Sequence, residues 1–243
     1  MSDSQSIRDS MRNAWNSERL IYRALQDNDD DHTFMHEAIA GDPVGFSLAY
    51  PESFRPQSKI MTASLLSMLR RKSLSVVICL STDESSRIRN KGGFDPPGTQ
   101  EAEPGIGLAT EDTSAKRQTS AQVPIGILTL TAQEQEQHHH RKTMLGINII
   151  NDHQGRGYGP EAINWALDWA FKFGGMHRVG LACYGYNDRA QRLYERLGFV
   201  KEGTVRECHW FNRAWHDEIY YGMLESEWEK IRSLQQSTSG RGQ

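Results

Sequence analysis

The chain has few cysteines, and it lacks both a long apolar run and a leading apolar segment. Its 243 residues include three cysteines without a Cys-x-x-Cys pair, which favours reduced thiols over a disulfide framework. No uninterrupted apolar span reaches the roughly 20 residues of a transmembrane helix. Met1 is followed by polar residues instead of the apolar core of a secretory signal. We therefore expect a cytoplasmic protein, with a nuclear location left open.

An excess of charge of one sign is also missing. The chain has 28 Lys and Arg against 31 Asp and Glu, a formal net charge of −3, so the basic surface that binds nucleic acids is not expected. The residues are 37% hydrophobic and 24% charged, as in ordinary soluble proteins. A mean hydropathy of −0.66 indicates that unstructured segments accompany the folded part. The length suits one domain, and we expect neither nucleic acid nor membrane as a partner.

Apolar periodicity predicts an α/β domain. Alternating or continuous apolar runs indicate strands, and apolar residues at helical spacing indicate helices between them. The predicted strands cover 19–25, 73–80, 124–132, 142–150, 178–184, 203–210 and 216–224. The predicted helices lie near 34–39, 60–69, 160–173, 188–197 and 225–232. The polar loop 133–141 joins two neighbouring strands, which are expected to form an antiparallel hairpin.

Three segments lack this periodicity. Residues 1–17 are predicted to be loose, with at most one short helix, and the Ser/Gly/Gln-rich end, 231–243, is predicted to be disordered. Residues 81–122 combine polar residues with Gly and Pro clusters that break any element. We predict a disordered insertion there, with a lid over the substrate as the alternative. The domain itself is expected to span 18–230.

Three consecutive histidines, at 138–140, raise the question of a metal site. Adjacent side chains cannot all converge on one ion, and no other His/Cys spacing supports a structural site. A solvated loop is the more common setting for such a tract. We therefore predict no metal site.

A glycine-rich bend at 149–160 joins an apolar strand to an amphipathic helix. Its three glycines, Gly155, Gly157 and Gly159, alternate with Arg156 and Tyr158. Glycines let backbone N–H groups approach a ligand closely, and a helix N-terminus favours negative charge. The bend is therefore predicted to bind a phosphate.

Two common phosphate motifs fit this bend poorly. No Gly-Lys-Ser/Thr follows it, so the lysine of a P-loop is missing. Residues 157–162 satisfy the G-x-G-x-x-A form of a dinucleotide fold, but the next strand, 178–184, is not followed by the acidic residue that binds a ribose hydroxyl. Hairpin-like strands follow instead of repeated βαβ units, which also disfavours a dinucleotide.

Two motifs resemble the GNAT superfamily of acetyl-coenzyme A-dependent N-acetyltransferases. Residues 154–159, Gln-Gly-Arg-Gly-Tyr-Gly, fit the family signature Q/R-x-x-G-x-G/A. Residues 187–199 resemble the second hallmark, an Asn that opens a helix followed by Leu-Tyr-Glu and Leu-Gly-Phe. Residues 202–206 and 217–220, with Trp228 beyond, resemble the branch that includes ribosomal-protein N-terminal acetyltransferases. The paired motifs at this spacing are more specific than either alone.

The resemblance implies a single GNAT-type α/β domain. Its sheet would be mixed and mostly antiparallel, with flanking helices and a central pair of strands that splay apart to admit pantetheine. Acetyl-coenzyme A is the implied co-substrate. The residues implied to bind it are Ile149 and Ile150 through their backbone, Gln154, Gly155, Arg156, Gly157, Tyr158 and Gly159 around the pyrophosphate, and Asn187 and Tyr194 near pantetheine and sulfur.

The resemblance also implies the chemistry. An amine attacks the thioester directly, which requires a donor for the developing oxyanion and a proton for the departing thiolate. Tyr194 matches the family's general acid, although packing on the apolar helix face would place it there too. Asn187 would bond pantetheine, with a local turn as the alternative. A backbone N–H near Ile150 is the expected oxyanion donor.

The general base stays unassigned. Many relatives use a glutamate on the strand before the bend, but 144–150 holds no carboxylate. Glu207, His209, Asp217 and Glu218 are possible substitutes on the last two strands, and a chain of waters is another. Cys183 and Cys208 lack a visible His/Asn partner set, so nucleophilic catalysis is not expected.

These motifs predict an N-acetyltransferase that acetylates a primary amine, either a protein N-terminus or a small molecule. The alternative is a catalytically silent GNAT-fold regulator that binds the coenzyme or a partner, since the strand carboxylate is missing. The acceptor site is expected in variable segments such as 43–59 and the last strands, and the sequence does not identify the acceptor. A monomer or a homodimer is expected.

Overall fold

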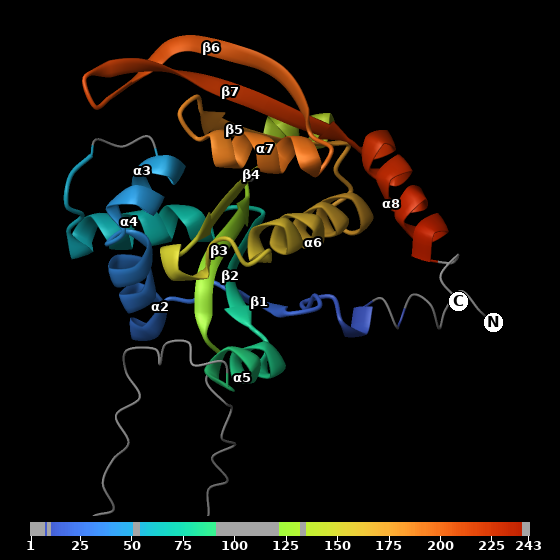
Figure 1. Ribbon diagram of the computed structural model, residues 1–243, viewed down its shortest axis with the longest axis horizontal. Helices are drawn as coiled ribbons and strands as arrows, with labels where there is room; N and C mark the ends of the chain where they lie inside the picture. The colour runs from blue at the N-terminus through green and yellow to red at the C-terminus, as the bar shows by residue number, and fades with distance from the viewer. Residues whose placement is uncertain (1–7, 9–10, 51–53, 91–121, 132–134, 240–243) are drawn as a thin grey trace, which may run out of the picture.

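The computed structural model describes residues 8, 11–50, 54–90, 122–131 and 135–239 (Figure 1). A seven-stranded sheet crosses the molecule in the order β1-β2-β3-β4-β5-β7-β6. Its strands are β1 (Leu20–Ala24), β2 (Leu74–Leu80), β3 (Pro124–Leu130), β4 (Lys142–Ile149), β5 (Arg178–Tyr184), β6 (Val200–Phe211) and β7 (Ala214–Leu224). Each predicted strand is thus confirmed to within a few residues.

The sheet is mixed, and the predicted fold class is confirmed. Every neighbouring pair is antiparallel except β4 and β5, which are parallel. Pairing between these two strands runs from Lys142 opposite Arg178 to Met144 opposite Gly180, although both strands continue beyond those residues. The central pair therefore separates after its first residues, as the splayed arrangement requires.

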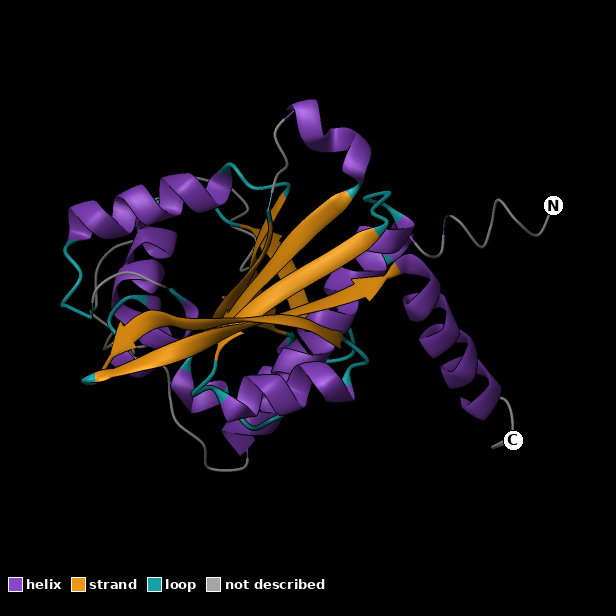
Figure 2. Cartoon of the chain, turned by 90° about the horizontal axis from the view of Figure 1, so that it is seen from above, coloured by secondary structure: helices purple, strands orange, loops and turns teal. Residues whose placement is uncertain are grey.

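Helices cover both faces of the twisted sheet (Figure 2). One face packs against α6 (Tyr158–Lys172), α7 (Asp188–Arg196) and α8 (Glu225–Ser239), and the other against α2 (Asp29–Thr33), the π-helix η1 (Phe34–Ile39) and α4 (Lys59–Arg70). Successive strand side chains point to opposite faces, so Val76 and Ile78 join the first core while Val77 and Cys79 join the second. The continuous apolar run in β2 follows from burial on both sides.

Two predicted segments differ from the structure. Residues 82–90, inside the predicted insertion, form helix α5 (Thr82–Asn90), so the prediction of disorder from residue 81 is wrong at its start. Helix α8 continues to Ser239, so the predicted disordered tail from 231 is wrong over most of its length. Residues 91–121 and 240–243 lie outside the described residues. Exposed polar helices such as these carry too weak an apolar period to be recognised.

Two further segments are more regular than the sequence indicates. Residues 43–49, predicted as part of a variable loop, form helix α3 (Pro43–Ala49), which begins at an N-cap where the Asp42 side chain accepts from the Val44 N–H. Within the predicted loose segment, residues 1–7, 9 and 10 are outside the described part, but Asn16 pairs with Ile21 and Trp165 Nε1 donates to the Ala14 carbonyl. Contacts with the domain therefore begin before residue 18.

Candidate functional site

The glycine-rich bend forms a tight turn between the 3-10 segment η3 (Asn151–His153) and α6. Gly155 and Gly157 have positive φ angles of 79° and 86°, the left-handed conformation that glycine adopts without strain. Gly157 is the N-cap of α6. Helix α6 begins at Tyr158, two residues before Pro160, which was predicted to open it. The unpaired N–H groups of the first helical turn therefore lie at this bend.

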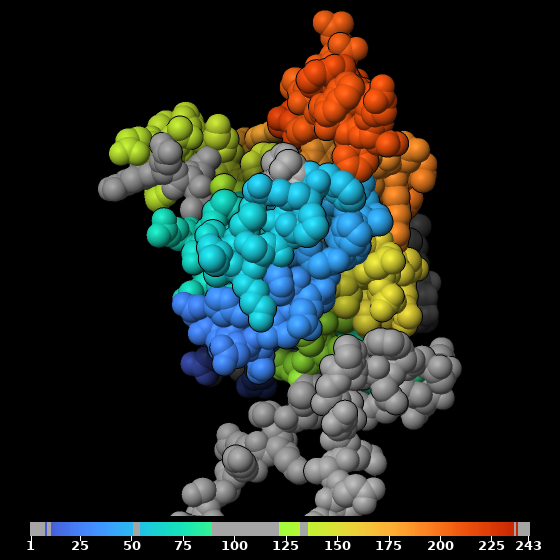
Figure 3. Space-filling view, turned by 90° about the vertical axis from the view of Figure 1, so that its left-hand side faces the viewer, coloured from blue at the N-terminus to red at the C-terminus, as the bar shows by residue number. Residues whose placement is uncertain are grey.

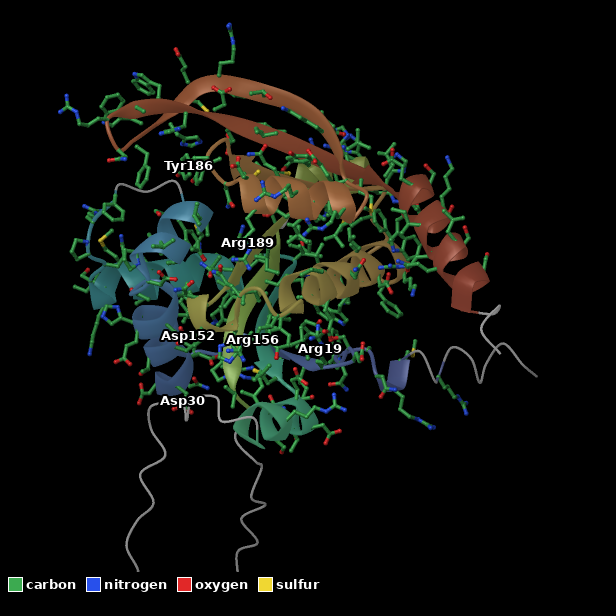
Figure 4. All side chains as sticks on the ribbon, in the orientation of Figure 1. Arg19, Asp30, Asp152, Arg156, Tyr186 and Arg189 are labelled. Carbon is green, nitrogen blue, oxygen red and sulfur yellow. The ribbon has the colours of Figure 1, made fainter. Side chains whose placement is uncertain are left out.

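Three arginines from different parts of the chain surround the bend (Figure 4). Arg156 belongs to the bend itself, Arg189 to the first turn of α7, and Arg19 to the residue before β1. Arg189 donates from Nη1 to Gln154 Oε1 at 2.8 Å, and Arg19 donates from Nη1 to the Arg156 carbonyl at 2.9 Å. Their positive charge adds to the partial positive charge of the helix N-terminus, so the bend suits an anion.

Arg19 is held by Glu161, in the first turn of α6. Its Nη2 and Nε lie 2.8 Å from the Glu161 carboxylate, and its backbone N–H donates to the same group at 2.7 Å. This ion pair neutralises much of the Arg19 charge, so Arg156 and Arg189 remain as the main positive groups. The sequence predicted Arg156 but not Arg19 or Arg189. Arg189 stands two residues after Asn187, a signal within the second hallmark, whereas nothing local marks Arg19.

Tyr158 contributes its backbone to the bend and its side chain to the core. The ring is 2% exposed, and its hydroxyl donates to Glu84 of α5 at 2.7 Å. Burial and the Glu84 carboxylate raise the pKa of Tyr158 to about 12. The segment that was predicted to be disordered thus supplies a contact that fixes the start of α6.

One edge of β4 pairs with β3, and the other edge, beyond its short pairing with β5, is open. The Ile150 N–H donates to the Ile125 carbonyl at 2.9 Å, and the Ile150 carbonyl accepts from the His153 N–H. Backbone groups alternate along a strand, so the N–H groups of Ile147 and Ile149 point away from β3, toward the gap beside β5. The backbones of Ile149 and Ile150 were predicted to pair with pantetheine, and a backbone N–H near Ile150 to supply the oxyanion donor. Both backbone groups of Ile150 are engaged in hydrogen bonds within the chain, whereas the Ile149 N–H faces the gap.

Gln154 closes the bend against the strand before it. Its Nε2 donates to the Ile149 carbonyl at 2.8 Å while its Oε1 accepts from Arg189. The side chain thereby links β4, the bend and α7. Gly159 faces α7 as well, because a Cβ there would lie 3.9 Å from Leu193 Cδ2.

Tyr194 and Asn187 lie at the two ends of α7. Tyr194 is 9% exposed, packs edge-on against Phe199 and Tyr221, and burial raises the pKa of its phenol. Asn187 is the N-cap of the helix, since its Oδ1 accepts from the Ala190 N–H at 3.1 Å. The local role that the sequence offered for Asn187 is therefore present. Gln191 Nε2 donates to the Gly185 carbonyl, which holds the start of the helix against the end of β5.

The candidate bases occupy different environments on β6 and β7. His209 Nε2 and Glu218 Oε1 are 3.8 Å apart, and both side chains are mostly buried. Asp217 accepts a hydrogen bond from the backbone N–H of Glu207, while the Glu207 side chain is exposed. The structure brings His209 and Glu218 together and leaves Glu207 and Asp217 to shape the strand.

A group of aromatic rings lies between the β6–β7 hairpin and α3. Tyr186 stacks on Tyr184 and Phe211 with 5.3 Å between ring centroids, meets His216 edge-on at 4.8 Å, and donates from its hydroxyl to the Ser47 carbonyl. The hairpin stands above the face built by α2, α3 and α4 (Figure 3). The sequence placed Tyr184 and His216 on predicted strands and Tyr186 and Phe211 just beyond strand ends, and only the fold brings these rings together.

The comparisons with known proteins agree with this geometry. Residues 96–199, which include the bend and α7, match the family model described as the Acetyltransferase (GNAT) family. The matched stretch holds both of the motifs that resemble this family.

Curated proteins match this chain over part of their length. Spermidine N(1)-acetyltransferase of Vibrio cholerae is 35% identical over 89 residues, 37% of this chain and 51% of that protein. A putative ribosomal N-acetyltransferase, YdaF of Bacillus subtilis, is 31% identical over 90 residues, 37% of this chain and 49% of that protein. The chain spans about half the length of the curated relatives it matches.

Solved structures match a larger share of this chain. The spermidine N-acetyltransferase of Vibrio cholerae in complex with CoA and spermine aligns with a TM-score of 0.60 at 22% identity, over 87% of this chain and 99% of that chain. A GNAT-family acetyltransferase from Bacillus anthracis aligns with a TM-score of 0.59 at 19% identity, over 87% and 98%. At these identities the likeness shows the fold.

No described helix is long and apolar enough to cross a membrane.

Proposed function

We propose that the chain is a GNAT N-acetyltransferase, which transfers the acetyl group of acetyl-coenzyme A to a primary amine. The observation that carries the proposal is the junction of two features: the gap that opens between β4 and β5 after Gly180, and the arginine-flanked bend at the start of α6. The gap suits an extended chain and the bend suits a diphosphate. Pantetheine and pyrophosphate are joined in that order in coenzyme A.

A diphosphate could approach the backbone N–H groups of the bend closely, because Gly157 carries no side chain. A Cβ on Gly157 would lie 3.1 Å from Arg19 Nη2, and the φ of this residue is unfavourable for any other side chain. The N–H groups of the first turn of α6 would donate to the phosphate oxygens, with Arg156 and Arg189 adding charge. Asn187 and Tyr194 would contact the coenzyme closer to its sulfur.

Pantetheine would add to the open edge of β4. Both backbone groups of Ile147 and the N–H of Ile149 point into the gap, so amides of an extended ligand can pair with them as another strand would. The Ile149 carbonyl already accepts from Gln154 Nε2. The Ile149 N–H is then the closest backbone donor to the end of the gap. It is our candidate donor to the oxyanion that forms when the amine attacks the thioester carbonyl.

Tyr194 would donate a proton to the departing thiolate. Burial raises the pKa of Tyr194, which keeps its phenol protonated, and the same burial raises the pKa of neighbouring thiols, as for Cys183, whose pKa rises to about 11. The protonated phenol of Tyr194 would thus be available to donate to the thiolate that leaves coenzyme A, while the attacking amine loses its proton to water. No covalent link to the enzyme is required.

The acceptor would approach from the face that α3 covers. There Tyr184, Tyr186 and Phe211 present stacked rings beside the end of β5, a surface that attracts alkylammonium groups through cation–π interactions. Of the relatives named above, one is a spermidine N(1)-acetyltransferase and the other, YdaF, is a putative ribosomal N-acetyltransferase. Small-molecule amines and protein N-termini are thus the two acceptor classes to test, with the protein as a monomer or homodimer.

Thiol release from acetyl-coenzyme A tests this function. Spermidine, a small alkylamine and a peptide with a free N-terminal alanine would each be added, with the N-acetylated peptide as the matched control. We expect release that depends on one of the free amines. A catalytically silent domain, the alternative suggested by the absence of a carboxylate from β4, would bind the coenzyme without releasing thiol for any amine.

A further inference from the structure

A side-chain cluster on the β6–β7 hairpin has no part in the acetyl transfer derived above. We propose that Cys208, His209 and Glu218 bind a zinc ion. Each residue offers one ligand atom, and the three atoms lie within 4.8 Å of one another, the one such group of His, Cys, Asp or Glu in the described part of the chain. The sequence predicted no metal site, because no His/Cys spacing outside the histidine tract supported one. Cys208 and His209 are adjacent, and a regular strand would point them to opposite faces.

The distance between His209 and Glu218 favours a shared ion. His209 Nε2 is buried and makes no hydrogen bond, and it lies 3.8 Å from Glu218 Oε1. This separation is too long for a hydrogen bond. Two ligand atoms bonded to one zinc ion at about 2.1 Å each lie roughly 3.4 Å apart at a tetrahedral angle and never more than about 4.2 Å apart. The observed distance falls within that interval.

A β-bulge turns the two adjacent residues toward one side. The register of β6 against β7 shifts between Val205, opposite Glu218, and His209, opposite His216. Glu207, within the bulge, has a positive φ of 51°, and its backbone N–H donates to the Asp217 carboxylate at 2.9 Å. The alternation of side chains is broken at this point. Cys208 and His209 therefore reach toward Glu218 together.

The remaining oxygen of Glu218 is held by a second residue. Tyr220 donates from its hydroxyl to Glu218 Oε2 at 2.6 Å, which orients the carboxylate. Metal ligands are commonly oriented by such outer hydrogen bonds. The Tyr184 ring packs edge-on against His209 at 4.5 Å and restricts the imidazole in the same way.

The donor set suits zinc. Thiolate, imidazole and carboxylate together are typical zinc ligands, and three protein ligands leave a fourth position for water. Cys208 donates a weak hydrogen bond to the Val205 carbonyl at 3.3 Å, and metal binding would replace it: the thiol releases its proton to solvent and the sulfur bonds the ion. The ion would link β6 to β7 across the bulge and stabilise the hairpin.

Zinc titration of the purified chain tests the site. The histidine tract at 138–140 is first changed to asparagine in every sample, because exposed histidines can bind metal on their own. After chelator treatment, we expect one zinc equivalent to bind in calorimetry. Cys208→Ser and Glu218→Gln should each weaken binding more than the roughly 10–100-fold expected of an outer-shell change such as Tyr220→Phe. Glu207→Gln, a neighbouring exposed carboxylate, is the matched control and should bind as before.

Thiol reactivity gives a second measurement that does not depend on activity. Cys208 is exposed while Cys79 and Cys183 are buried, so a thiol reagent applied to the folded chain reports Cys208. Zinc should slow this reaction, and His209→Asn should remove the protection while circular dichroism shows a folded chain. Zinc binding that is equal in Glu218→Gln and Glu207→Gln, or a Cys208 reaction rate unchanged by zinc, would overturn the proposal. Neither result bears on acetyl transfer.

Discussion

Arg189 Nη1 lies 2.8 Å from Gln154 Oε1 and donates a hydrogen bond to it, joining the first turn of α7 to the bend before α6. Gln154 Nε2 in turn donates a hydrogen bond to the Ile149 carbonyl at the end of β4. Residues from both sequence hallmarks therefore meet in one short hydrogen-bond chain. The bend and the gap between the central strands are positioned by the same side chains.

The first prediction concerns Arg189. Arg189→Ala should weaken coenzyme A binding about 10-fold, because a charged hydrogen-bond donor beside the phosphates is lost. Calorimetry at low and high salt measures this, and the difference from the unmodified chain should shrink as salt screens the charge. The control is Arg192→Ala, which removes an exposed arginine three residues further along α7. Equal weakening in both variants would point to general electrostatics instead of the bend.

The second prediction concerns the backbone of the bend. Gly157→Val places a β-branched residue at a φ of 86° with its Cβ 3.1 Å from Arg19, so the turn should distort at a cost on the order of 1–3 kcal/mol. Coenzyme A affinity should fall at least roughly 10-fold. Gly203→Val, where nothing lies within 4 Å of the added Cβ, should bind normally. Retained affinity in Gly157→Val would show that the diphosphate binds elsewhere.

The third prediction concerns Tyr194. Tyr194→Phe should lower kcat roughly 100-fold or more while coenzyme A binding is retained, because the ring still packs but the proton is gone. Tyr221→Phe is the matched control: its ring is 5.8 Å from Tyr194, and its hydroxyl donates to Glu195. Steady-state kinetics and calorimetry separate the two effects. A kcat unchanged in Tyr194→Phe would leave this residue with packing alone.

The fourth prediction concerns pH. Burial, and next the charge of Arg156, lower the pKa of His153, whose Nδ1 is buried without a hydrogen bond. The unfolded chain, with an ordinary histidine pKa of about 6.5, then binds a proton before the folded chain does. Stability should be full above about pH 7.5 and fall as the pH drops through about 6.5 toward the lower folded pKa. His153→Gln should flatten this part of the profile.

Denaturant unfolding at several pH values measures that profile. His177→Gln, which changes an exposed histidine away from the bend, serves as the comparison. The same acid-side slope in His153→Gln and in the unmodified chain would mean that another group carries the dependence.

Most of the fold could be predicted because its apolar periods are strong. The strand 178–184 and the amphipathic helix after the bend were recognised from such patterns, whereas the two hallmarks were recognised by their resemblance to a known family. Helix α5 was not recognised, because its mainly polar surface gives no apolar face to detect. Its Glu84 nevertheless reaches Tyr158, a contact between residues 74 positions apart.

The candidate site was predictable only where a local motif carried it. Gly155, Arg156 and Gly157 are consecutive, so the sequence alone shows that they lie close together. Arg19 reaches the bend from 137 residues away, which no local pattern reveals. Which N–H groups of β4 face the gap depends on the register of Ile150 with Ile125. A register error of one residue in the prediction exchanges the N–H groups that face the gap with those that bond to β3. The Cys208 and His209 pair likewise becomes visible only through the bulge.

The most direct test of the proposed function is acetyl transfer itself. The chain would be incubated with acetyl-coenzyme A carrying an isotopically labelled acetyl group and with spermidine or an N-terminal alanine peptide, and the amine product analysed by mass spectrometry. We predict labelled acetyl on the amine, formed at a much lower rate by Tyr194→Phe and by Gly157→Val. Tight coenzyme A binding with no labelled product from any amine would contradict the account and identify a silent GNAT domain.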